Sequence, residues 1–552
     1  MKMMLPVALA GFLSFSLGAA PSVPAPYVEW QQSYGGNFGE YNPSIRETFD
    51  GGYILCGTSS SPPFGNKTTP HFGVTDLWVL RLDGDGQILW QKTFGGDEQE
   101  GPHCAIRQTS NGGFIVTTVS RSGISGNKTT PLLGRPGDFD LWVVRLDNDG
   151  ELVWQASFGG VGWEFFATSL QETSDGGFIL GCTSNSGASG NKSSPNYGND
   201  DYWLVRLDRN GAKLWDQTFG GTRDDRLHAV QQTADGGFIL GGESWSAVSG
   251  NKTSPNFGPT NSAGADFWVI RVDPDGNKLW EKSYGGSSWD FLYSLAQTSD
   301  GGFAFGGYSY SGASGNKTST NFGIIDFWVV RTDASGEILW DKAYGGGGVS
   351  ILYSLQTTFD GGFILGGHSD ETFAGGRVGN KTSPSFGGGD YWIVRTDERG
   401  NSLWQLSFGG SGSELLYDVQ QTSDGGFIVG GESRSSADGN KTSIVYGGED
   451  YWVVKLAPED LDADGVLDLR DLCPNTPPGD VVNDAGCSIG QLVPCDGPWQ
   501  NHGEYVQAIT EISADFLRAG LISREQRSAI IHQAVKSDCG EPFKKTGLRP
   551  DK

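Results

Sequence analysis

Residues 201–221 read D-Y-W-L-V-R-L-D-R-N-G-A-K-L-W-D-Q-T-F-G-G, and this stretch decides the fold. Two apolar segments, Asp201–Asp208 and Ala212–Phe219, are joined by the turn D-R-N-G, in which glycine supplies a positive φ. Upstream, Thr168–Thr173 and Gly177–Thr183 are joined by S-D-G-G. No helical period runs through these segments. They predict four short antiparallel strands with two tight hairpins.

Tryptophan marks the recurrence of this unit along the chain. Seven tryptophans precede an aromatic residue and a Gly-Gly pair: Trp30, Trp90, Trp154, Trp215, Trp280, Trp340 and Trp404. Seven others end a D-[FLY]-W pattern: Trp78, Trp142, Trp203, Trp268, Trp328, Trp392 and Trp452. Each set recurs every 60 to 65 residues, with a [DN]-G-G-[FY] turn in every interval. Four antiparallel strands per repeat are typical of a propeller blade, so we predict an all-β, seven-bladed β-propeller.

The two ends of the array indicate how it closes. The first repeat begins on a fourth-strand pattern, Val28–Tyr34, and the last ends on a third-strand pattern, Asp450–Leu456. The seventh blade is complete only if these two segments pair. We therefore expect the N-terminal strand to close the ring and to hide two strand edges. An open solenoid is the alternative.

Composition and charge limit the class of protein. Glycine contributes 86 of 552 residues and aromatic residues 12%, which excludes global disorder. The formal net charge of −26 repels phosphate backbones and excludes nucleic acid as a partner. An apolar run after Lys2 ends at Ala20 and is typical of a secretory signal peptide. A membrane anchor is the alternative, but the run is shorter than the ~20 residues that a span needs. No later segment could span a bilayer.

The long connection between the second and third strands carries G-N-K-[TS] in every repeat. It places seven lysines on the face that also holds the crossovers between blades: Lys67, Lys128, Lys192, Lys252, Lys317, Lys381 and Lys441. Long loops on a rigid scaffold are where binding usually occurs. The lysines are candidate donors for an anionic or polyhydroxyl ligand. Alternatively, Gly-Asn forms a structural turn and the lysines are solvated.

Six crossovers carry an acid four residues after Gly-Gly, with Ser350 in its place in one repeat: Glu40, Glu100, Glu164, Asp225, Asp290 and Glu414. Such a ring could hold cations near the channel mouth, or it could cap turn amides and pair with bases. A base recurs in the middle of each third-strand pattern, and we expect these residues to form ion pairs between blades: Arg81, Arg145, Arg206, Arg271, Arg331, Arg395 and Lys455.

Catalytic motifs are scarce. None of the six histidines has metal-ligand spacing, and neither G-x-S-x-G nor a phosphate-binding loop occurs. The hairpin L-D-x-x-G-x-x-L-W, at Leu207–Trp215, resembles the repeat of quinoprotein dehydrogenase propellers. That family typically has eight blades, and many members have an adjacent cysteine pair, whereas this chain has seven repeats and no such pair. The array as a whole is similar in style to kelch-like extracellular repeats.

An acidic loop follows the last repeat. Asp460, Asp462, Asp464, Asp468 and Asp471 occupy loop positions 1, 3, 5, 9 and 12, and Gly465 occupies position 6. Val466 would offer its carbonyl at position 7. Oxygen ligands at this spacing converge on one point and suit Ca²⁺, so we predict a calcium site. The alternative is an acidic linker.

The segment Asp460–Cys487 resembles the thrombospondin type 3 repeat of exported bacterial proteins. The resemblance implies calcium binding, a stiff spacer and a location outside the cytoplasm. Cys473, Cys487, Cys495 and Cys539 allow three pairings in an exported protein, of which we favour 473–487 and 495–539. Cys56, Cys104 and Cys182 are expected to be buried, with one pair possible.

Two helical stretches are expected between the last two cysteines, at about 503–519 and 524–536, with a capping box at Ser523 and Gln526. The chain therefore divides into a signal peptide (1–20), a propeller (27–457), a calcium module (458–494), a helical hairpin (495–541) and a disordered tail (542–552).

The leading hypothesis is a secreted, calcium-binding, non-enzymatic binding or adhesion protein, located outside the cell, at its surface or in the periplasm. Its long-loop face would recognise an extracellular polysaccharide or a surface protein. One alternative is a quinoprotein-like or carbohydrate-active enzyme at the channel mouth, and another is a purely structural surface protein. Near-identical loops in seven repeats favour the non-enzymatic hypotheses, because an active site usually breaks the symmetry of a repeat.

Overall fold

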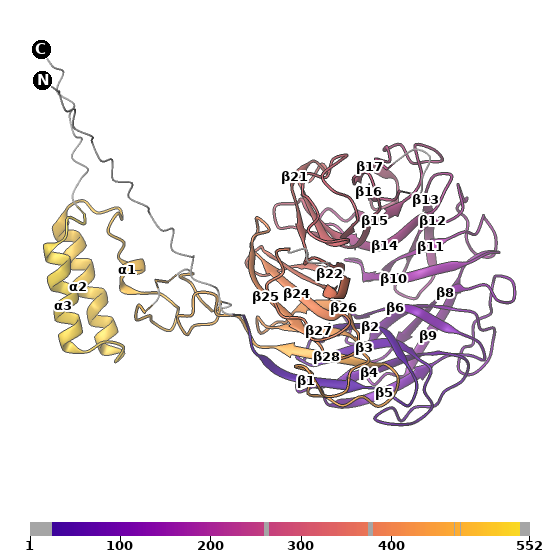
Figure 1. The fold of residues 1–552 in the computed structure, drawn as a ribbon, viewed down its shortest axis with the longest axis horizontal. Helices are drawn as coiled ribbons and strands as arrows, with labels where there is room; N and C mark the ends of the chain where they lie inside the picture. The colour runs from indigo at the N-terminus through magenta and orange to yellow at the C-terminus, as the bar shows by residue number, and fades with distance from the viewer. Residues whose placement is uncertain are drawn as a thin grey trace, which may run out of the picture.

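The computed structural model describes residues 25–258, 264–373, 379–468, 470–474, 476–477 and 479–540. They form a ring of seven sheets followed by a short irregular segment and a helical hairpin (Figure 1). The predicted all-β, seven-bladed propeller is confirmed. The expected signal peptide (1–20) and disordered tail (542–552) lie outside the described residues.

Each of the first four blades contains four consecutive antiparallel strands. Blade one holds β2 (Glu40–Glu47), β3 (Tyr53–Ser59), β4 (Asp76–Leu82) and β5 (Ile88–Phe94). Blade two holds β6 (Glu100–Gln108), β7 (Phe114–Ser120), β8 (Asp140–Leu146) and β9 (Leu152–Phe158). Blade three holds β10 (Glu164–Glu172), β11 (Phe178–Ser184), β12 (Asp201–Leu207) and β13 (Lys213–Phe219). Blade four holds β14 (Asp225–Gln232), β15 (Phe238–Ser244), β16 (Asp266–Val272) and β17 (Lys278–Tyr284).

The remaining blades follow the same plan, except that the seventh takes one strand from the start of the chain. Blade five holds β18 (Asp290–Gln297), β19 (Phe303–Ser309), β20 (Asp326–Thr332) and β21 (Ile338–Tyr344). Blade six holds β22 (Val349–Thr357), β23 (Phe363–Asp370), β24 (Asp390–Thr396) and β25 (Ser402–Phe408), with the 3₁₀ turn η1 (Glu371–Phe373). Blade seven holds β26 (Glu414–Gln421), β27 (Phe427–Ser433), β28 (Asp450–Leu456) and β1 (Val28–Tyr34).

The strand β1 pairs with β28 in antiparallel register, with Trp30 opposite Lys455 and Tyr34 opposite Tyr451. The core lies between blades. Seven clusters of buried side chains each join two adjacent blades, including the seventh and the first. The tryptophan of every third strand is fully buried in one of these clusters. Replacing one of them by alanine would cost about 3–5 kcal/mol.

Topology sorts the connections between strands into two faces. The hairpins after the first and third strands are tight, and Gly176 and Gly211 occupy them with φ of +81° and +83°. We call this end of the ring the tight-turn face. The opposite end, the long-loop face, holds the loop between the second and third strands and the crossover to the next blade.

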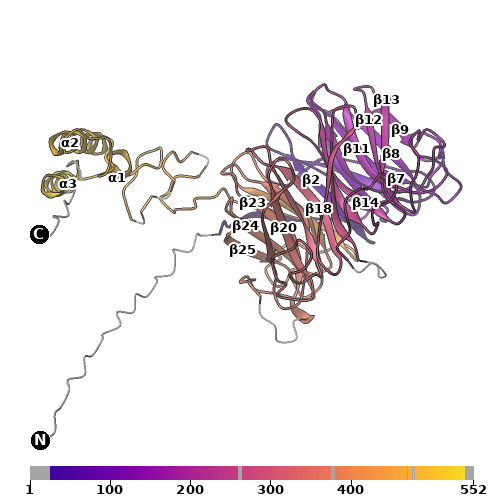
Figure 2. The same ribbon diagram turned by 90° about the horizontal axis from the view of Figure 1, so that it is seen from above.

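Beyond the propeller lie α1 (Ile489–Leu492), α2 (His502–Arg518) and α3 (Arg524–Lys536). The two predicted helices are confirmed within one residue at each end, and Ser523 and Gln526 form the predicted capping box. The disulfides Cys473–Cys487 and Cys495–Cys539 confirm the favoured pairing. Figure 2 shows the helical hairpin standing apart from the ring.

Cys56, Cys104 and Cys182 are buried and unpaired in the structure, so the pair considered from sequence is not formed. No helix in the described ranges has the length and apolar character needed to cross a bilayer.

Candidate functional site

The repeated loop lysines are structural. The Lys192 ammonium donates to Ser194 O at 3.0 Å and to Thr218 Oγ1 at 2.6 Å, and it lies 5.5 Å from the centre of the Trp203 ring. Burial lowers the pKa of Lys192 to about 8. Lys381 is half-buried. The other six lysines are buried: Lys67, Lys128, Lys192, Lys252, Lys317 and Lys441. Both expectations from sequence, a ring of ligand donors and a set of solvated lysines, are wrong, because the ammonium groups bind their own loops.

The asparagine before each lysine links neighbouring blades. Asn191 accepts from Gly159 N at 2.9 Å and donates to Ser157 O at 2.9 Å, both in or beside the last strand of the preceding blade. The Gly-Asn-Lys string therefore holds the long loop in place, as the structural alternative proposed.

The six crossover acids are fully buried as well. The Glu40 carboxylate accepts from Gly36 N at 3.0 Å and from Ser59 Oγ at 2.8 Å. Burial raises the pKa of Glu40 to about 7 and that of Glu164 to about 8. All six acids accept a hydrogen bond from a turn amide, as one of the two alternatives proposed: Glu40, Glu100, Glu164, Asp225, Asp290 and Glu414. Their burial contradicts the other alternative, an accessible ring of cation ligands.

Six of the seven third-strand bases form an ion pair with the acid in the first turn of their own blade, and Arg145 bonds Asn111 at that position. Arg395 also pairs with Glu459, which follows blade seven. Arg206 Nη2 lies 2.6 Å from a carboxylate oxygen of Asp175, which sits in the turn between the first two strands of the same blade. Lys455 makes the same contact with Asp424 at 2.9 Å. The expected pairing between blades is wrong, because each base lies at the tight-turn end of its strand, beside the turn of its own sheet.

An aromatic group breaks the sevenfold repeat on the long-loop face. We call it the aromatic arc: Trp163, Trp245, Trp289, Phe291 and Tyr310. Trp163 and Trp289 immediately precede β10 and β18, whereas Trp245 and Tyr310 immediately follow β15 and β19. The arc therefore spans blades three to five.

The arc is partly exposed and has charged neighbours. Trp163 and Trp289 are each 42% exposed. Trp289 packs edge-on against Tyr310 at 5.4 Å, and Trp245 packs against Phe291 at 5.6 Å. The Arg226 guanidinium lies 5.0 Å from the Trp245 ring. The result is an amphipathic surface of ring faces bordered by charge.

Sequence reasoning missed this arc, although it left a signal. Fourteen of the 18 tryptophans occupy repeated positions, and three of the other four, Trp163, Trp245 and Trp289, lie together here. Tryptophans that lie outside the repeated positions therefore mark a surface that the repeated positions do not reveal.

Inside the channel, the first strand of each blade bulges. In β14 the register shifts between Leu227 and Ala229, which leaves His228 at the bulge. The bulge regions of six blades carry rings that contact one another in series at 4.4 to 5.3 Å. We call them the ring belt: His103, Phe166, His228, Tyr293, Tyr353 and Tyr417. One member of the belt has a charged neighbour in the next strand: His228 Nε2 lies 2.8 Å from Glu243 Oε2, in β15.

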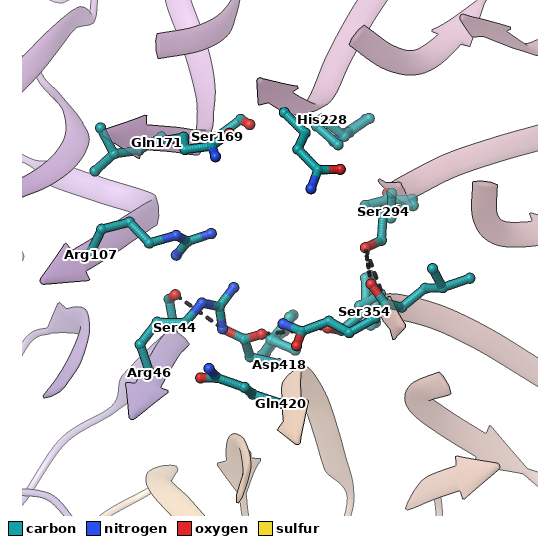
Figure 3. Close-up of a pocket in the computed structure, with 18 of the residues that line it drawn as sticks. Ser44, Arg46, Arg107, Ser169, Gln171, His228, Ser294, Ser354, Asp418 and Gln420 are labelled. Atoms are coloured by element: carbon teal, nitrogen blue, oxygen red, sulfur yellow. Dashed lines mark hydrogen bonds and ion pairs between the residues drawn. The ribbon is translucent and has the colours of Figure 1, made fainter. Parts of the chain in front are cut away.

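A cavity of about 880 Å³ extends from the ring belt to the tight-turn face, lined by first-strand side chains (Figure 3). Blades one, two, three and seven contribute charged side chains to it. Asp418 Oδ2 accepts from Ser44 Oγ at 3.1 Å and from the Arg46 guanidinium. Figure 3 shows the Arg107 guanidinium pointing into the open space.

The acidic loop brings three of its predicted ligands together. Carboxylate oxygens of Asp460, Asp462 and Asp464 lie within 4.8 Å of one another. Asp462 Oδ1 and Asp464 Oδ2 are buried without a hydrogen-bond partner. Orphaned carboxylate oxygens that converge in this way fit a hard cation such as Ca²⁺.

The other predicted ligands are engaged in the loop itself. Asp468 Oδ1 accepts from Leu461 N at 2.8 Å, and Asp471 Oδ1 accepts from Cys473 N at 2.7 Å. Val466 donates its N–H to Asp464 Oδ1 at 2.8 Å, which leaves its predicted ligand, the carbonyl oxygen, untested. The structure therefore assembles half of the predicted ligand set, and Asp468 and Asp471 lie outside the three-carboxylate group.

Comparison with known proteins adds no family. No family model and no curated protein matches the chain. Among solved structures, the chain is similar to a protein of unknown function from Dyadobacter fermentans, with 11% identity and a TM-score of 0.40. It is also similar to Sqt1 from Chaetomium thermophilum (12%, 0.39) and to the WD40 domain of Pan2 from Neurospora crassa (10%, 0.36). These matches cover 79%, 79% and 76% of this chain and 100%, 99% and 89% of theirs.

Proposed function

We propose that the protein is an exported, calcium-binding, non-enzymatic recognition protein that binds a polysaccharide on the long-loop face of its propeller. The observation that carries this proposal is the aromatic arc. Exposed apolar patches bordered by polar groups are typical of interaction sites. The exposed faces of Trp163 and Trp289 supply such a patch on a rigid scaffold.

The chemistry of the arc suits sugars. A pyranose ring has an apolar face of C–H groups and an equator of hydroxyls. The ring faces of tryptophan and tyrosine pack against the apolar C–H face, and charged side chains form hydrogen bonds with the hydroxyls. Arg226 lies 3.4 Å from Asp200 and 3.5 Å from Asp224, so donors and acceptors stand beside the Trp245 ring.

The span of the arc favours a chain of sugars over a single one. Its members come from three consecutive blades, and each blade offers a ring at or near the channel mouth. An extended glycan can contact several rings at once, and linked contacts raise the overall affinity without any one being strong.

Export and calcium binding are supported by other residues. Two disulfides suit an oxidising compartment, and the apolar N-terminal run is typical of an export signal. The orphaned oxygens of Asp462 and Asp464 support a calcium site in the segment that resembles a thrombospondin type 3 repeat. We propose that calcium stiffens this segment as a spacer behind a propeller of kelch-like repeats.

A glycan array, run with and without Ca²⁺, tests the proposal. We expect the protein to bind neutral or acidic polysaccharides, and Trp163→Ala and Trp289→Ala each to weaken binding at least fivefold. Phe359→Ala is the matched control, because this ring is 62% exposed but lies in a tight-turn hairpin. Unchanged binding in both tryptophan variants would refute the assignment of the arc. Shortening of the bound glycan would favour the enzymatic alternative.

A further inference from the structure

The cavity on the tight-turn side of the ring belt lies on the opposite side of the belt from the aromatic arc, and its lining includes two arginines and three acids. Arg46 and Arg107 contribute two guanidinium groups. Asp418 faces the same space, but its carboxylate is already bonded by Arg46, Ser44 and Ile45 N. The Arg46 charge is therefore balanced within the protein.

Arg107 has no such partner. Its one hydrogen bond within the described chain runs from Nη1 to Ile106 O at 2.7 Å, and no carboxylate in the described residues forms an ion pair with it. Burial, together with the positive charge of Arg46, lowers the pKa of Arg107 to about 9. The Asp418 carboxylate raises this pKa in part, but it is bonded by Arg46 and makes no direct ion pair with Arg107 among the described residues. A guanidinium that no carboxylate contacts is costly in a partly desolvated channel unless an anion binds it.

Glutamine side chains add further donors around the same space. Gln171, Gln231 and Gln420 each use Oε1 to accept a backbone N–H of the next blade, at 2.6, 2.8 and 3.1 Å. Because the oxygen is engaged, each amide leaves its NH₂ group available to the cavity. The acids at the rim are occupied: Glu47 binds Ser423, and Glu172 binds Ser110.

We propose that this cavity binds a small organic carboxylate, whose carboxylate group is held by Arg107 with Arg46 beside it. The planar guanidinium matches a carboxylate with two parallel hydrogen bonds. The rings of His103, Tyr293 and Tyr353 at the inner end of the cavity cover the organic body of the ligand. The volume lies within the range of ordinary small-molecule sites.

Titration calorimetry on the full chain at low ionic strength tests the site. The probes are glucuronate and 4-hydroxybenzoate, each beside its neutral counterpart, glucose or phenol, and inorganic phosphate. We expect at least one carboxylate to bind at least tenfold more tightly than its counterpart. Arg107→Gln should weaken that binding at least tenfold, and Arg107→Lys should have an intermediate effect. Arg399→Gln is the control, because the Arg399 side chain is exposed in a turn of blade six and lines neither the cavity nor the arc.

Several results would overturn the proposal. The proposal fails if the unmodified protein binds neither carboxylate more tightly than its neutral counterpart, whatever the variants show. Equal or tighter binding of phosphate with the same dependence on Arg107 would replace a carboxylate site by a general anion site. Arg107→Gln removes a half-buried cation that forms no ion pair within the described residues, so we expect the variant to melt no lower than the parent. A lower melting temperature without ligand would make Arg107 structural. Glycan binding at the arc should be unchanged in this variant, which separates the two proposals.

Discussion

Glu459 Oε1 accepts a hydrogen bond of 2.7 Å from Trp404 Nε1, which ties the segment after the propeller to blade six, although that segment leaves from blade seven. The second oxygen of Glu459 lies 3.2 Å from Arg395 Nε. The acidic loop begins at the next residue, and Asp468 N donates to Glu459 O at 3.0 Å. The loop is thus held at its base by the ring, while its three converging carboxylates extend beyond it.

This attachment shapes the first prediction, which concerns calcium. Without metal, Asp460, Asp462 and Asp464 repel one another, so we expect the segment after Glu459 to be cut readily by protease in chelator. Millimolar Ca²⁺ should slow cleavage at least tenfold and leave the melting of the propeller nearly unchanged. Asp464→Ala should abolish the protection, because it removes a central ligand, whereas Asp480→Ala, an exposed acid outside the loop, should retain it. Limited proteolysis and calorimetry on the full chain provide the measurement, and an absence of binding heat would contradict the site.

The second prediction concerns pH. Burial raises the pKa of Glu40 and Glu100 to about 7 and that of Glu164 to about 8, from a usual value of 4.5. A carboxyl whose pKa is higher in the folded state stabilises the fold below its unfolded pKa, and this contribution is lost as pH rises through the folded pKa. The melting temperature should therefore fall between pH 5 and pH 7.5. Lys192, with a pKa of about 8, changes charge only above this window.

Glu164→Gln tests the cause of that pH dependence. The variant keeps the shape but has no proton to lose, so its melting temperature should fall less steeply over the same range. Glu398→Gln, at an exposed position in a turn of blade six, should show the parental slope. A flat profile in the unmodified protein would show that these acids are ionised throughout.

The third prediction concerns the buried lysines. Lys192→Ala removes the donor that serves Ser194 and Thr218, and we expect it to lower the free energy of unfolding by about 1–3 kcal/mol. Lys282→Ala, which breaks only a surface pair with Glu337, should cost about 0–1 kcal/mol. Denaturant unfolding measures both. Equal costs would mean that Lys192 is solvated after all.

The fourth prediction concerns the strand that β1 supplies to blade seven. Deleting Val28–Tyr34 would leave the edge of β28 unpaired, from Tyr451 to Leu456. Because an exposed strand edge pairs with other chains, we expect aggregation and a loss of cooperative unfolding. A variant that begins at Ala25 keeps the strand and serves as the control. Size-exclusion chromatography and thermal unfolding would detect the difference, and a soluble, equally stable deletion would rule out a role for β1 in stability.

The fold was predictable because local signals agreed with the global repeat. The two tryptophan sets fix where each blade lies, the D-G-G turns fix the hairpins, and Gly520 and Ser523 fix the helix boundaries. Each signal reflects a backbone geometry that only a few residue types can adopt, so it can be recognised in the sequence without knowing which residues pack around it.

The direction of side chains was not predictable in the same way. The spacing of G-N-K shows that Lys192 recurs on one face, but not that the loop folds back and turns its ammonium group toward Thr218. His228 lies in the channel because of a bulge, and a bulge inserts a residue that no alternation pattern marks. The arc and the cavity depend on residues where the blades differ, whereas repeat analysis looks for what the blades share.

The point at which the chain leaves the propeller distinguishes the two faces of the ring. The third strand of a blade ends at the tight-turn face, so β28 delivers the chain to the acidic loop on the side where the Arg107 cavity opens. The aromatic arc lies on the reverse side. The chain therefore leaves the propeller on the side away from Trp163 and Trp289, so the segment after Glu459 begins clear of the proposed glycan surface.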